Sequence, residues 1–109
     1  MTDEEILAKL PTPEEVIAAY ERNNLRPRTE YADITDGMTC AIGACIGQTV
    51  QSPVEVFATS RGLDREVARD FGIGFDTGYS GGTYRSNRAA ILRGVAVGQA
   101  VRKHFSEAQ

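Results

Sequence analysis

Cys40 and His104 are the residues of this chain whose side chains could supply nucleophilic chemistry. Cys40 follows Asp36-Gly37 at the start of a predicted helix, where backbone N–H groups stabilise a thiolate and lower the pKa of the thiol. His104 is the one histidine and could serve as the base of a Cys/His pair. Cys40 also stands among Ala, Gly and Ile residues, which is typical of a buried packing position. We therefore favour a structural Cys40, with a thiol-dependent enzyme centred on Cys40 and His104 as an alternative.

The segment 72–88 contains residue types that bind anions. Gly81 and Gly82 precede a predicted helix, and backbone N–H groups at such a place hold phosphate in many proteins. Arg85 and Arg88 would add positive charge. The segment has neither a P-loop nor a complete dinucleotide fingerprint. An anion-binding protein using this loop is a second alternative, and the simpler interpretation is that the glycines only turn the chain.

The cysteines predict neither a metal site nor a disulfide. Two Cys and one His are too few for a structural zinc site unless carboxylates or a second chain contribute. Cys40 and Cys45 lie five positions apart in a predicted helix, so their Cα atoms would be about 8–9 Å apart. That exceeds the roughly 7 Å limit for a disulfide. We expect free thiols, which fit a reducing cytoplasm, and no metal or cofactor.

Small residues recur every four positions in two predicted helices, at 38–50 and 87–105. They are Gly43 and Gly47 in the first helix, and Ala90, Gly94 and Gly98 in the second. This spacing lets helix backbones approach closely. Each glycine costs about 1 kcal/mol in a helix interior relative to Ala, so a compensating contact is expected. We predict that these two helices cross at their small residues and form the centre of the core, although the same residues could mediate self-association.

The remaining helices are short and are marked by capping signals. Thr2 and Thr12 each precede a Glu by three residues, which predicts two capping boxes. Ser52-Pro53-Val54-Glu55 predicts a third capping box, with Pro at the first helical position. Another helix should begin at Asp64 and stop at Gly72. The fold class expected is therefore all-α, a compact bundle of five or six mostly short helices around the pair 38–50 and 87–105. A small α+β domain with a hairpin in 72–84 is the alternative.

Length and composition indicate one ordinary globular domain. The chain has 109 residues, of which 41% are hydrophobic and 25% charged, so residues 1–109 should form a single helical domain. No apolar stretch is long enough to cross a membrane, and the acidic N-terminus does not resemble a secretory signal. The net charge of −3 combines −5 over residues 1–36 with +2 over residues 37–109. An acidic first third argues against nucleic-acid binding.

These observations predict a soluble cytoplasmic protein without a supported catalytic set. We expect a non-enzymatic protein-interaction or regulatory module that binds a protein partner or forms a homo-oligomer. The glycine spacing would allow a homodimer. The thiol-dependent enzyme and the anion-binding loop remain the alternatives.

Overall fold

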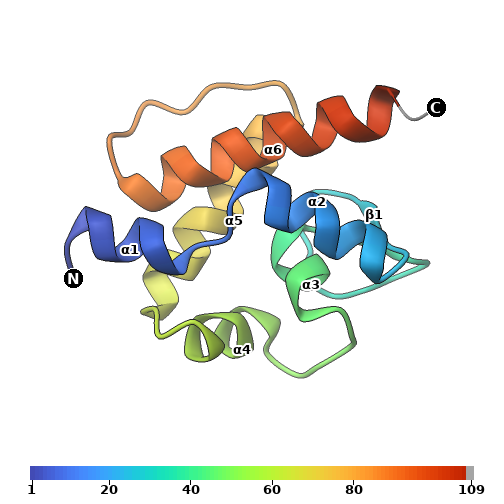
Figure 1. The fold of residues 1–109 in the computed structure, drawn as a ribbon, viewed down its shortest axis with the longest axis horizontal. Helices are drawn as coiled ribbons and strands as arrows, with labels where there is room; N and C mark the ends of the chain where they lie inside the picture. The colour runs from blue at the N-terminus through green and yellow to red at the C-terminus, as the bar shows by residue number, and fades with distance from the viewer. Residues whose placement is uncertain (108–109) are drawn as a thin grey trace.

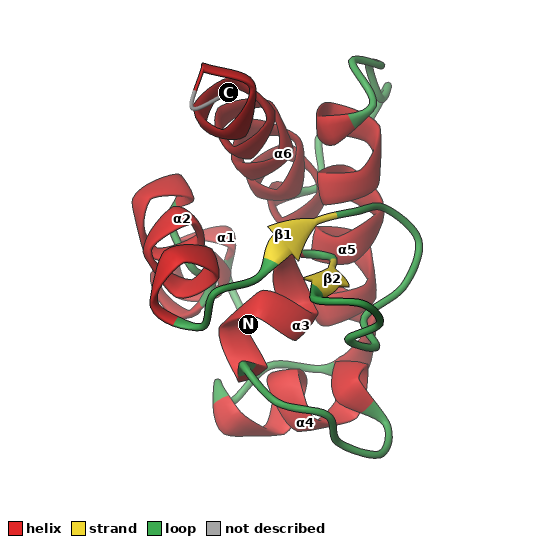
Figure 2. Ribbon diagram, turned by 90° about the vertical axis from the view of Figure 1, so that its right-hand side faces the viewer, coloured by secondary structure: helices red, strands yellow, loops and turns green. Residues whose placement is uncertain are grey.

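The computed structural model describes residues 1–107 and is mostly helical, which confirms the all-α prediction. Two very short strands accompany the helices (Figures 1 and 2). No helix within the described residues is long and apolar enough to cross a membrane. The elements in chain order are α1 (Asp3–Lys9), α2 (Pro13–Arg22), β1 (Arg26–Pro27), β2 (Met38–Thr39), α3 (Ala41–Ile46), α4 (Pro53–Ser60), α5 (Arg65–Tyr79) and α6 (Ala89–Glu107).

The first two helices begin as their capping signals predict. The hydroxyl of Thr2 accepts a hydrogen bond from the N–H of Glu5, and the Glu5 carboxylate accepts one from the N–H of Thr2. Thr12 and Glu15 form the same reciprocal pair at the start of α2. The third predicted box does not form, because Ser52 has a positive φ of 51° and makes no side-chain capping bond. Helix α4 therefore begins at Pro53 without that support.

The centre of the core is the crossing of α5 and α6, not of the predicted pair 38–50 and 87–105. A Cβ on Gly74 would overlap the Ile91 carbonyl oxygen, and one on Gly94 would overlap that of Phe71. Gly98 meets the carbonyl of Phe75 in the same way. The small residues of α6 thus do allow a close helix contact, and α5 is the partner. Ala90 is buried beside them in the core.

The helix predicted at 38–50 is shorter than expected and packs elsewhere. Only Ala41–Ile46 is helical. A Cβ on Gly43 would collide with the Thr39 side chain and the Ala32 carbonyl oxygen, so this glycine accommodates the strand and loop before the helix. Gly47 ends α3 with a φ of +79°, a left-handed conformation that favours glycine. Neither glycine contacts α6, which is why the predicted crossing is wrong.

Helix α5 continues past Gly72, where the sequence predicts its end. It runs to Tyr79, so the alternative of a hairpin in 72–84 is wrong as well. Gly74 and Gly78 are tolerated inside the helix because the α6 backbone lies against them. Since Gly74 meets Ile91 and Gly78 meets Val95, the two helices run parallel. The loop 80–88 must then return along α6, as Figure 1 shows.

The segment between α2 and α3 is held by a two-residue parallel strand pair. Arg26 pairs with Met38 and Pro27 with Thr39. The hydroxyl of Tyr20, fully buried, donates a 2.8 Å hydrogen bond to the Thr39 carbonyl oxygen. These contacts fix Thr39, two residues before the start of α3, against α2. They thereby position α3 between α2 and α4 (Figure 2).

Candidate functional site

The structure gives Cys40 the environment of a packing residue. Cys40 is the N-cap of α3 and is only 5% exposed. Burial raises the pKa of its thiol, and this outweighs the opposite effect of the backbone N–H groups of Gly43 and Ile42. The lowered pKa expected at a helix start is therefore not found. A thiol that keeps its proton is a poor nucleophile at neutral pH.

His104 has a different partner from the one that a Cys/His pair requires. Its Nε2 lies 3.6 Å from a carboxylate oxygen of Glu21, so α6 and α2 meet there. Its ring packs edge-on against Phe105, with 5.1 Å between ring centroids. The imidazole therefore belongs to the contact between these two helices.

The glycines of the predicted anion loop use their N–H groups within the chain. The N–H of Gly81 donates to the carbonyl oxygen of Gly78, and that of Gly82 donates to Thr77, so both complete the end of α5. Arg88 forms a 3.0 Å ion pair with Asp70. Arg85 lies exposed on the same loop. An anion in this loop would thus have to displace existing hydrogen bonds.

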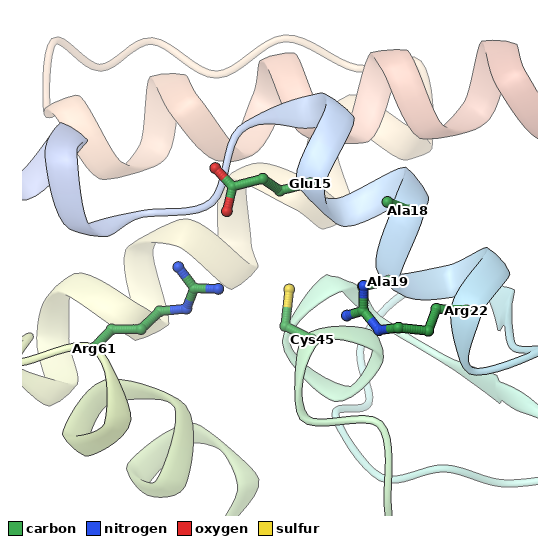
Figure 3. Close-up of a pocket in the computed structure, with 6 residues that line it drawn as sticks. All are labelled: Glu15, Ala18, Ala19, Arg22, Cys45 and Arg61. Carbon is green, nitrogen blue, oxygen red and sulfur yellow. The ribbon is translucent and has the colours of Figure 1, made fainter.

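A cleft between α2, α3 and the end of α4 brings two other arginines together (Figure 3). Its volume is about 200 Å³. The guanidinium groups of Arg22 and Arg61 lie on the two sides of the Cys45 sulfur in this view, and Glu15 lies above (Figure 3). The lining residues are Glu15, Ala18, Ala19, Arg22, Cys45 and Arg61.

Helix α2 supplies one wall of the cleft through a single face. Glu15, Ala18, Ala19 and Arg22 follow the spacing i, i+3, i+4 and i+7, which places them on one side of a helix. The two alanines between the charged residues have short side chains and leave the cleft open. Arg22 is exposed, and no hydrogen bond holds its side chain within residues 1–107. Its N–H donors therefore have no partner among these residues.

Arg61, at the end of α4, is held in place by the chain. Its Nη1 donates a 3.1 Å hydrogen bond to the Lys9 carbonyl oxygen, and its guanidinium lies 5.2 Å from the centroid of the Phe57 ring. Lys9 in return donates from Nζ to the Gly62 carbonyl oxygen. A guanidinium has five N–H donors, so most of them remain after the bond to Lys9.

Cys45 lies on the floor of the cleft and is not activated there. Burial raises the pKa of its thiol to about 11, although Arg61 and Arg22 act in the opposite direction. The thiol therefore stays protonated near neutral pH. What the cleft offers chemically is two guanidinium groups and one carboxylate around a small volume.

A second, smaller pocket lies against Cys40. Its volume is about 170 Å³, and Asp76 of α5 contributes a carboxyl to its lining. Asp76 Oδ1 is buried without a hydrogen-bond partner, and burial raises the pKa of this carboxyl. Within residues 1–107, no three His, Cys, Asp or Glu side chains cluster where they could hold a metal ion.

Sequence reasoning missed Arg22 and Arg61. The sequence does indicate the wall of the cleft that α2 provides, because its two charged residues and two alanines are spaced to lie on one face of a helix. Nothing in the sequence relates Arg22 to Arg61, which lies 39 positions later, because only the packing of α3 between α2 and α4 brings the two together.

Comparison with known proteins finds no family model, curated protein or solved structure that matches this chain. The function must therefore be argued from the residues of the cleft.

Proposed function

We propose that this chain is a non-enzymatic regulatory module that binds an oxyanion in the cleft between α2 and α4. The observation that carries the proposal is the convergence of Arg22 and Arg61 on one small cleft. Guanidinium groups are the side chains best suited to carboxylate and phosphate, because their planar N–H donors match two oxygens at once. The raised pKa values of both thiols support binding over nucleophilic catalysis.

Binding at this place would join α2 and α4, two helices that pack mainly on other helices and not on each other. Helix α2 packs on α3 and α6, while α4 packs on α3 and α5. An anion held by Arg22 of α2 and Arg61 of α4 would bridge them directly. A ligand that binds only the folded state stabilises it, by an amount that grows with the ratio of its free concentration to its Kd. This coupling of ligand to helix arrangement is what makes a regulatory role reasonable.

The test is a titration followed by two-dimensional amide NMR at constant ionic strength. Acetate, sulfate and inorganic phosphate serve as probes for the natural chain and three Arg→Gln variants. We expect saturable shifts at Ala18, Ala19 and Arg61, and affinity at least about tenfold lower in Arg22→Gln, because hydrogen bonds to charged groups contribute roughly 1.5–3 kcal/mol. Arg61→Gln should weaken binding similarly, and Arg85→Gln should leave it unchanged.

Arg22→Gln is the sharper of the two cleft variants. Arg22 is exposed, whereas Arg61 also packs on Phe57 and bonds to Lys9, so its replacement removes these contacts as well as a donor in the cleft. If the amide shifts on titration centred on residues 81–88 and disappeared in Arg85→Gln, the anion would bind at the loop and not in the cleft. Absence of saturable shifts with all three probes would refute the proposal.

The cytoplasmic location, the protein partner and the homo-oligomer remain predictions from the sequence. Size-exclusion chromatography with light scattering, with and without phosphate, would test self-association. A constant monomer mass under both conditions would argue against the homo-oligomer.

A further inference from the structure

We propose that the cleft selects an oxyanion that retains a proton at neutral pH, namely free hydrogen phosphate, over one that does not, such as sulfate. This inference rests on the proposed function and concerns the same cleft. The observation behind it is that the two guanidinium groups share the cleft with a carboxylate, that of Glu15.

The lining of the cleft presents both donors and an acceptor. Arg22 and Arg61 have only N–H donors, and the carboxylate of Glu15 only accepts. Oε1 of Glu15 already accepts from the N–H of Thr12, as part of the capping box of α2, and from the hydroxyl of Thr12. Oε2 is the oxygen left to meet a ligand. Among the described residues, Glu15 forms no ion pair with either arginine, so their charges stay available to a third group.

A fully deprotonated anion fits this lining poorly. Sulfate would bring an oxygen that cannot donate toward the carboxylate of Glu15, and like charges placed together cost several kcal/mol in an interface. Hydrogen phosphate carries an O–H that can donate to Glu15, while its other oxygens accept from the two guanidinium groups. An ion that contacts all three charged groups would then meet a matching donor or acceptor at each, which no proton-free anion offers.

The same argument separates free phosphate from a phosphate ester. The second pKa of a phosphorylated side chain is about 6, so that group is mostly proton-free at pH 7.5. Inorganic hydrogen phosphate keeps a proton at this pH. The short side chains of Ala18 and Ala19 leave a volume of about 200 Å³, enough for a small ion. We therefore commit to the free ion as the ligand.

The experiment compares the natural chain with Glu15→Gln. Gln at the third helical position also closes a capping box, so this variant removes the charge and retains the support for α2. Affinities for inorganic phosphate and for sulfate are measured by amide NMR at pH 7.5 and constant ionic strength. The natural chain should bind phosphate at least about tenfold more tightly than sulfate, because a like-charge contact opposes sulfate alone. In Glu15→Gln the ratio should fall toward one as sulfate binding improves.

Three outcomes would overturn the inference. The natural chain could bind phosphate and sulfate with equal affinity, and Arg22→Gln could lose binding of both ions. That result would refute the selectivity and leave the proposed function standing. Binding of N-acetyl-phosphoserine amide as tight as that of phosphate at pH 7.5 would refute the need for a proton. No saturable binding of either ion would refute both proposals together. Unchanged melting temperature in Glu15→Gln is the control for an intact fold.

Discussion

Asp76 places an ionisable carboxyl in a half-buried position. It lies on α5, lines the pocket beside Cys40, and has one carboxyl oxygen buried without a hydrogen-bond partner. Burial is the largest cause of its raised pKa, and the charge of Glu30 acts in the same direction. The folded protein therefore holds this proton more tightly than the unfolded chain does. Ionising Asp76 costs stability.

Replacing Asp76 with Asn should stabilise the protein at neutral pH. The natural chain loses stability as pH rises from the ordinary Asp pKa through the raised folded value, because the unfolded state releases its proton first. Below the ordinary value both states are protonated and the advantage of Asn disappears. Melting temperatures at pH 3 and pH 7 check this. A lower melting temperature for Asp76→Asn at pH 7 would show that the charge is needed.

The two thiols should react slowly in the folded protein. The pKa of each is raised by burial, to about 11 for Cys45, so little thiolate exists at pH 7.5. Alkylation by iodoacetamide, followed by mass spectrometry, should be slower in native buffer than in urea for both cysteines. Rapid native labelling of Cys40 would revive the thiol-dependent enzyme.

At the scale of elements, glycines set which helices form the centre of the core. Gly74 and Gly78 of α5 and Gly94 and Gly98 of α6 bring two backbones together, so each carbonyl takes the place of a missing Cβ. Gly72 lies on the same helix, but a Cβ there would meet only the tip of the Ile42 side chain, at 3.3 Å. The two kinds of glycine in one helix provide a matched comparison.

Gly74→Ala should destabilise the protein by about 1–3 kcal/mol or more, since overpacking against a backbone cannot be relieved by a rotamer change. Gly72→Ala should be close to neutral, because the gain in helix propensity of roughly 1 kcal/mol offsets a small shift of Ile42. Urea denaturation of both variants measures the difference. Equal stability of the two variants would contradict the close approach of α5 and α6.

At the scale of the whole molecule, Arg93 connects α6, the last helix, to the first helix and the residues that follow it. Its Nη1 lies within hydrogen-bond distance of three carbonyl oxygens, one in the last turn of α1 and two in the connection to α2, at 3.2 to 3.4 Å. They belong to Leu7, Leu10 and Pro11. Carbonyls at a helix end lack partners within the helix, and a cation there is favourable. Arg93 thus holds α1 and the start of α2 against α6.

Arg93→Met should lower the free energy of unfolding by roughly 1–3 kcal/mol, because the carbonyls lose a charged donor. Lys103→Met is the matched control, since Lys103 is an exposed cation on the same helix. Urea denaturation checks both variants. An Arg93→Met protein as stable as the control would show that the connection is held by apolar contacts alone.

Local signals in the sequence determined the helix starts and the fold class. Thr12 and Glu15 form the capping box that begins α2, and this depends only on their separation of three residues. The four-residue spacing from Ala90 to Gly98 predicts a close helix contact but does not say which helix is the partner. The partner itself was decided by tertiary structure. Glycines within 72–78 look like a loop until α6 packs on them. Arg22 and Arg61 line one cleft only because α3 packs between their helices. Capping depends on neighbours in sequence, whereas packing and clefts depend on residues far apart in it.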